Sequence, residues 1–285
     1  MKKLLCYIFI FCSIFSLCGC GEKNKPENQI LKYNLDYEPA TLDPQVAGGS
    51  PANTVIVNTF EGLTKINEDD SITGGVAASW DTNENFTEYT FHLRDNAYWS
   101  DDSKTPVTAQ DFLYAIQRAI NPSTNSPNAK NLFCIKNAKA INLKQKSIEA
   151  LGVKVPDSNT IIFSLENETR DLPRILTLPV AMPCNKDFFE KCNGQYGMES
   201  KNILYNGPFK IKNKYGWDHY NAIHLVRNSN YHGTTPAISA GISFTIGQNS
   251  DNIVDLIKNE SLDAGKISST KISNAETNKM KITSF

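Results

Sequence analysis

Segments with the period of a β-strand alternate with segments of helical period along this 285-residue chain, at irregular spacings. Runs rich in β-branched and aromatic residues predict strands at 30–34, 89–93, 160–165, 209–212, 223–227 and 242–246. The clearest helix is expected to begin at Thr108, a good N-cap residue with Asp111 three positions later, and to end at Asn121-Pro122. Shorter helices are expected at 51–60, 171–178, 187–192 and 252–258. The uneven spacing argues against a regular βαβ array and against repeats, so we expect an α+β (mixed α/β) fold.

Composition and missing motifs narrow the function. With 29 Lys and Arg against 30 Asp and Glu, the chain has no basic field to hold nucleic acid, and 40 % hydrophobic residues are too many for a disordered chain. Phosphate loops, nucleophile elbows and zinc helices are all missing from the sequence, which argues against an enzyme. The histidines lack metal-ligand spacing, so neither a metal site nor a cofactor is expected; they are His92, His219, His224 and His232.

The first residues have the layout of a secretory signal. Lys2 and Lys3 precede an apolar run, residues 4–17, that is shorter than the roughly 20 residues of a membrane-spanning helix. The run ends in Leu17-Cys18-Gly19-Cys20, which resembles the lipobox of bacterial lipoproteins, where cleavage before the cysteine leaves it to carry lipid. We expect a signal peptide over 1–19, acylation of Cys20 and a tether over 20–29; an ordinary signal peptide cut nearby is the alternative.

Few cysteines remain beyond this leader. They are Cys134, Cys184 and Cys192, too few for a disulfide framework. Cys184 and Cys192 could close a short loop, or all three could be free thiols.

Four motifs follow one another within residues 75–118. They are Ala77-x-Ser79-Trp80, Tyr89-Thr90-Phe91-His92-Leu93-Arg94, Trp99-Ser100-Asp101 and Thr108-Ala109-x-Asp111-Phe112. Because these motifs occur in this order and spacing, the chain resembles the extracellular solute-binding proteins of family 5, which are the peptide and nickel receptors of ABC importers. Within that family it resembles the oligopeptide-binding type. Leu42-Asp43-Pro44, Phe60-Glu61-Gly62-Leu63 and Asn206-Gly207-Pro208-Phe209 also match, so the resemblance covers residues 30–265.

The resemblance implies a fold of the periplasmic-binding-protein type II kind. Lobe one would comprise 30–53 and 178–265, a small accessory domain 54–177, and the start of a second lobe 266–285. Because such proteins usually run to about twice this length, we expect a truncated form whose second lobe is absent. A cleft with one wall leaves its ligand hydrated, so we expect low stability and weak or no peptide binding.

The resemblance also implies that an extended oligopeptide pairs its main chain with the protein, for delivery to the permease and ATPase of an importer. The ligand-binding candidates lie just before Leu42: Tyr37, Glu38, Pro39, Ala40 and Thr41. Glu38 could face the ligand or could be a solvent-facing strand carboxylate. Where peptide-binding relatives can bring a Tyr toward the peptide, this chain has Asn128.

Other functions stay open from the sequence. A surface lipoprotein that acts as an interaction or decoy module is one alternative, and the same scaffold binding nickel or another small solute is a second. A secreted hydrolase is disfavoured by the missing catalytic motifs. In each case we expect a lipid-anchored protein on the extracytoplasmic face of the cell membrane, on a Gram-positive surface rather than in a periplasm.

The lipid anchor gives the first testable prediction. Cys20→Ala removes the thiol that would carry the lipid, so we expect metabolic fatty-acid labelling and membrane association to be lost. Cys18→Ala, two residues earlier, is the matched control and should keep both. Unchanged labelling of the Cys20 variant would contradict the lipobox interpretation.

Overall fold

The structure, a computed structural model, describes residues 29–233, 239–248, 252–268, 270, 272–277 and 281. Cys20, the predicted signal peptide and all of the predicted tether except Gln29 lie outside these residues. Among the described residues, no helix is both long and apolar enough to cross a membrane.

A five-stranded sheet, called sheet A here, brings the first strand of the described chain beside strands from residues 209–246. Its order is β1 (Ile30–Leu35), β11 (Gly241–Ile246), β10 (Ala222–Arg227) and β8 (Phe209–Ile211), and the short β9 (Trp217–Asp218) also pairs with β10. β1 runs parallel to β11, whereas the other pairs are antiparallel. The predicted strands at 30–34, 209–212, 223–227 and 242–246 are thereby confirmed.

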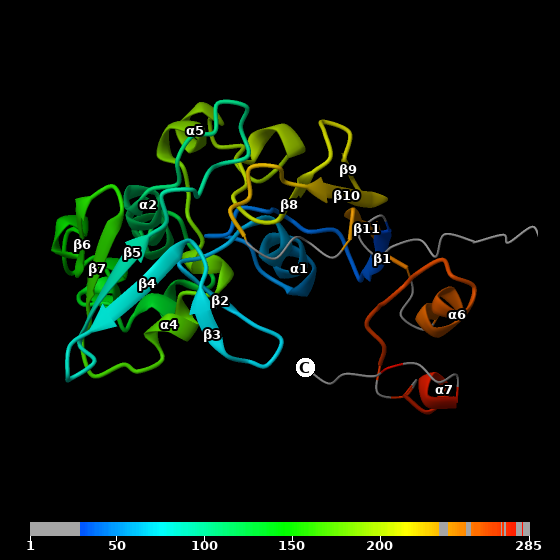
Figure 1. Cartoon of the computed structure of the whole chain (residues 1–285), viewed down its shortest axis with the longest axis horizontal. Helices are drawn as coiled ribbons and strands as arrows, with labels where there is room; N and C mark the ends of the chain where they lie inside the picture. The colour runs from blue at the N-terminus through cyan, green and yellow to red at the C-terminus, as the bar shows by residue number, and fades with distance from the viewer. Residues whose placement is uncertain are drawn as a thin grey trace, which may run out of the picture.

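A four-stranded antiparallel sheet lies at the other end of the molecule (Figure 1). Its order is β4 (Ala77–Thr82), β5 (Glu88–Leu93), β7 (Thr160–Ser164) and β6 (Val153–Asp157). β5 and β7 confirm two predicted strands, but β4 and β6 were missed because neither has an uninterrupted run of β-branched and aromatic residues, and β6 contains Pro156. A small hairpin, β2 (Thr64–Ile66) and β3 (Ile72–Gly74), was missed as well.

Short helices connect the sheets. The α-helices are α1 (Ser50–Thr59), α2 (Ala109–Ile120), α3 (Ala138–Asn142), α4 (Leu172–Ile175), α5 (Lys186–Lys191), α6 (Ile253–Lys258) and α7 (Ile272–Thr277). The described residues also form the 3₁₀ turns η2 (Ala129–Leu132), η3 (Ile148–Ala150), η4 (Pro179–Ala181) and η5 (Ser200–Asn202). α1 lies between the two sheets, while α6 and α7 lie beyond sheet A (Figure 1). The predicted helix at 171–178 is only the one turn of α4.

The predicted cap of α2 is confirmed in detail. The carboxylate of Asp111 accepts hydrogen bonds from the backbone N–H of Thr108 at 2.8 Å and from its hydroxyl at 3.1 Å. The buried face of α2 contains Phe112, Ala115 and Ile116, which form the helical apolar stripe seen in the sequence. Asp111 itself is only 8 % exposed, and this burial raises its pKa to about 6.

The raised pKa of Asp111 makes stability depend on pH. Between about pH 4 and 6 the folded protein keeps a proton on Asp111 that the unfolded chain has released, so this group makes the protein less stable as pH rises. Asp111→Asn cannot ionise. We expect the wild type to lose up to about 3 kcal/mol relative to this variant from pH 4 to pH 7, as measured by urea unfolding. Parallel pH curves for the two proteins would contradict the prediction.

Candidate functional site

The segment that follows β1 is the one in which the sequence predicts ligand binding. It leaves sheet A beside the turn between β9 and β10 and leads toward α1. Tyr37 is 53 % exposed. The other candidates are placed as follows: Ala40 is exposed, Glu38 and Thr41 are half-buried, and Pro39 is buried.

The backbone of this segment is unpaired within the part of the chain that the structure describes. Among the hydrogen bonds between described residues, none uses the backbone N–H or C=O groups of Tyr37, Glu38 or Ala40. In β1 itself, every residue from Ile30 to Leu35 is paired with a residue of β11. Main-chain groups that have no partner in the fold are available to pair with another extended chain.

The Glu38 side chain is held by the protein itself. Its Oε1 accepts a hydrogen bond from the indole Nε1 of Trp217 at 2.9 Å and lies 2.7 Å from Nδ1 of His219. Its Oε2 accepts the backbone N–H of Tyr220 at 3.1 Å. The side chain is only 13 % exposed, so the solvent-facing alternative is wrong. Glu38 fixes the turn between β9 and β10 against the candidate segment.

Thr41 is tied to a loop distant in sequence. Its hydroxyl donates to the carbonyl of Gly197 at 3.2 Å and accepts the backbone N–H of Asp43 at 3.1 Å. Gly197 has φ +78, and a Cβ there would lie 2.3 Å from the backbone nitrogen of Asp43. Only glycine allows the two segments to approach this closely.

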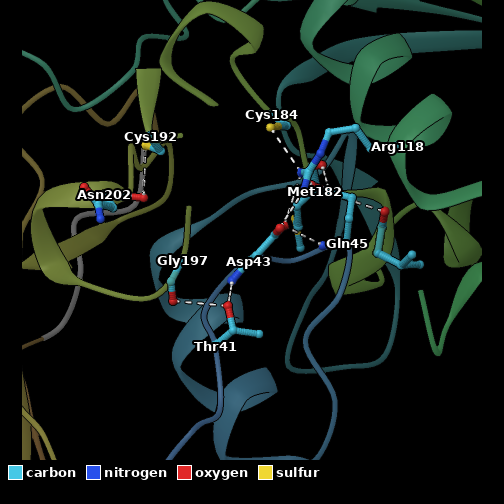
Figure 2. A network of polar contacts seen from close by, with 10 residues as sticks. Thr41, Asp43, Gln45, Arg118, Met182, Cys184, Cys192, Gly197 and Asn202 are labelled. Atoms are coloured by element: carbon cyan, nitrogen blue, oxygen red, sulfur yellow. Dashed lines mark hydrogen bonds and ion pairs between the residues drawn. The ribbon is translucent and has the colours of Figure 1, made fainter. Parts of the chain in front are cut away.

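A buried guanidinium anchors the next turn of chain. Figure 2 shows Arg118 of α2 reaching Asp43 and Gln45. Nη2 of Arg118 lies 2.6 Å from Oδ2 of Asp43, and Nη1 donates to Oδ1 of Asp43 at 3.2 Å and to Oε1 of Gln45 at 2.7 Å. The side-chain amide of Gln45 also donates to the carbonyl of Met182 at 2.9 Å, which links the network to the loop after η4.

Burial shifts the pKa values of the groups in this network. Burial alone would lower the pKa of Arg118, but the hydrogen bonds with Asp43 raise it above its ordinary value. The thiol of Cys184 accepts from Nη1 of Arg118 at 3.4 Å, and burial raises the pKa of this thiol to about 12. Cys184 therefore stays protonated at neutral pH, and Cys134 and Cys192 are free thiols too.

Asn128 contacts the turn before α1, outside the candidate segment. Its side-chain Nδ2 donates to the carbonyl of Ala47 at 3.1 Å. Asn128 therefore joins the loop after α2 to the turn that precedes α1. In this position it serves the contact between two loops.

A separate pocket of about 390 Å³ lies beside α1 and β2. It is lined by Val57, Phe60, Glu61, Gly62, Thr64, Lys65, Ile66, Thr177, Met182, Pro208 and Tyr231, none of them a predicted ligand residue. Glu61 is buried here: Tyr231 donates its hydroxyl to Oε1 at 2.5 Å, and Nε2 of His232 lies 2.6 Å from Oε2. Burial alone would raise the pKa of Glu61, but the hydrogen bonds with His232 and Tyr231 lower it below its usual value.

The histidines each contact a side chain of the protein. The pairs are His92 with Asp81, His219 with Glu38, His224 with Ser243 and His232 with Glu61. Within the described ranges, no three His, Cys, Asp or Glu side chains converge as a metal site would require.

Comparison with known proteins places these features in a family. A family model described as bacterial extracellular solute-binding proteins, family 5 Middle, matches residues 71–284. The chain belongs to this family. Its fold is the mixed α/β fold of periplasmic binding proteins of type II, as expected from the sequence.

Among family 5 relatives, the chain is 34 % identical over 242 residues to the oligopeptide-binding protein OppA of Bacillus subtilis, covering 81 % of this chain and 44 % of that protein. It is 40 % identical over 195 residues to the periplasmic murein peptide-binding protein MppA of Escherichia coli, covering 66 % and 34 %. The chain thus spans less than half the length of these relatives.

Solved structures of the family agree. An oligopeptide ABC transporter substrate-binding domain from Bacillus anthracis superposes with a TM-score of 0.81 at 28 % identity, over 88 % of this chain and 48 % of that one. Haemophilus influenzae OppA in complex with the peptide RPPGFSPFR gives a TM-score of 0.82 at 26 % identity, over 89 % and 49 %.

The anchoring of Glu38 can be tested by mutation. Glu38→Ala leaves the indole of Trp217 and the backbone N–H of Tyr220 without an acceptor, so we expect the free energy of unfolding to fall by about 1–3 kcal/mol. Glu199→Ala is the control, because this exposed carboxylate lies 3.6 Å from the other nitrogen of His219 and should change stability by less than about 0.5 kcal/mol. Equal losses in urea unfolding would contradict the assignment.

Proposed function

We propose that this chain is a substrate-binding lipoprotein of an ABC importer that binds oligopeptides. The observation that carries the proposal is the backbone from Tyr37 to Ala40, which follows a strand of sheet A and forms no hydrogen bond with any other described residue. A peptide laid along it would gain main-chain hydrogen bonds, as a strand added to a sheet does. The names of the relatives, which bind oligopeptides and murein peptides, support the same ligand class.

The side chains of the segment favour recognition of the peptide backbone rather than its sequence. Glu38 and Thr41 are both engaged by protein donors and acceptors, so neither is free to select a ligand side chain. Tyr37 and Ala40 are exposed, so an aromatic ring and a methyl group are the side-chain surfaces that a bound peptide could contact here. Affinity from main-chain pairing tolerates many peptide sequences, which suits a nutrient receptor.

Within this proposal, residues 30–53 and 178–265 form lobe one and 54–177 the accessory domain. The chain binds solute and performs no chemistry, and it delivers peptide to a permease and its ATPase. A lipid on Cys20 would hold it on the extracytoplasmic face of the membrane.

Peptide binding can be tested with the purified chain. We expect saturation-transfer NMR, which detects complexes as weak as about millimolar, to give signals for unrelated tri- to pentapeptides. Peptides of the same sequence with N-methylated amides lose donors to the Tyr37–Ala40 backbone, so their signals should fall at least several-fold. These N-methylated peptides are the matched control for nonspecific contact.

Equal signals from both sets would overturn the backbone-pairing proposal. If peptides give no signal at all, an interaction or decoy module becomes the better interpretation. Import of labelled peptide into cells that express only this binding protein separates those two functions.

A further inference from the structure

One segment of the chain has a charge unlike the rest. Residues 129–154 contain six lysines, no arginine and a single acidic residue, Glu149, in a chain that has 29 Lys and Arg against 30 Asp and Glu as a whole. All six lysines are exposed. We call them the lysine surface: Lys130, Lys136, Lys139, Lys144, Lys146 and Lys154.

Residues of this segment contact one another beside the four-stranded sheet. The side chain of Asn137 donates to the carbonyl of Ala150 at 2.6 Å. The backbone N–H of Gly152 donates to the carbonyl of Lys136 at 2.9 Å, and Lys154 belongs to β6. Residues 136–137 and 150–152 are therefore neighbours.

The positive charge of the lysine surface is not neutralised within the described part of the chain. None of the ion pairs between described residues includes one of the six lysines. Lys146 donates to the neutral side chain of Asn137 at 2.6 Å. The neighbouring carboxylate of Glu166 accepts the backbone N–H of Asn137 at 2.6 Å. The segment thus presents a positive field to solvent.

An exposed apolar side chain lies within this field. Leu143 follows α3, is 53 % exposed, and is flanked in sequence by Lys139 and Lys144. The described pocket of the protein is lined by none of these residues. The lysine surface thus combines exposed positive charge with one exposed apolar side chain.

We propose that the lysine surface binds an anionic phospholipid membrane. Lysines are point charges that suit a diffuse layer of phosphate headgroups, whereas a discrete acidic motif on a protein is better matched by the fork of arginine. The lysine stems and Leu143 can lie at the headgroup and acyl boundary, a contact that a soluble polyanion does not offer. The contact would turn the four-stranded sheet toward the membrane, and it does not depend on peptide binding.

Lysine footprinting tests the proposal on the full chain. An amine-reactive reagent is applied with neutral phosphatidylcholine vesicles or with vesicles that also contain phosphatidylglycerol. We expect labelling of the lysine surface to fall several-fold only with the anionic vesicles, and the protection to disappear at about 0.5 M salt. Exposed lysines elsewhere are the internal reference: Lys191, Lys201 and Lys212. If the two sets of lysines respond alike, or soluble polyphosphate protects as well as vesicles, the proposal is wrong.

Charge variants give an independent test. The triple variant Lys139→Gln, Lys144→Gln, Lys154→Gln should weaken partitioning onto anionic vesicles by roughly a hundredfold. The control triple Lys191→Gln, Lys201→Gln, Lys212→Gln has the same net charge and should stay within about threefold of wild type. Thermal unfolding of both triples checks that the fold is kept. Equal losses in the two triples would mean that overall charge, not this surface, governs binding.

Discussion

The buried ion pair between Arg118 and Asp43 is the contact on which the candidate site depends. Both side chains are out of water, at 8 % and 4 % exposure, so each would be strongly unfavourable alone. The guanidinium satisfies both oxygens of Asp43, and its face packs 3.8 Å from the centroid of the Phe189 ring. One charge on α2 thereby fixes the chain that leaves the candidate segment.

Neighbouring contacts then orient the segment itself. Asp43 is bound to Thr41, and Thr41 to Gly197, so the direction of the chain is set at its downstream end. Upstream, Glu38 is held by Trp217 of β9 and by the turn that follows this strand. With both ends held by side chains, the backbone between them is held in place although it forms no hydrogen bond with another described residue. Preorganisation of this kind would lower the ordering cost of the proposed peptide binding.

The sequence predicted those features of the fold that depend on residues close together in the chain. The cap of α2 and the apolar strands, such as β5 and β7, were confirmed because their signals lie within a few residues. The roles of Glu38 and Arg118 could not be predicted in this way, because their partners are distant: Glu38 and Trp217 are 179 residues apart, and Arg118 and Asp43 are 75. The fold itself was predicted from the order of four motifs, which indicated the family. Local periodicity alone could not have indicated it.

The pairing of β1 with β11 has a consequence for how the chain matures. Asn34 at the end of β1 binds Gln248, which lies 214 residues later. At a synthesis rate of roughly 5–20 residues per second, the first strand waits about 10–40 s for its partner to be made. Sheet A therefore cannot close while the chain is still short, and throughout that interval β1 exists without the strand to which each of its residues is paired.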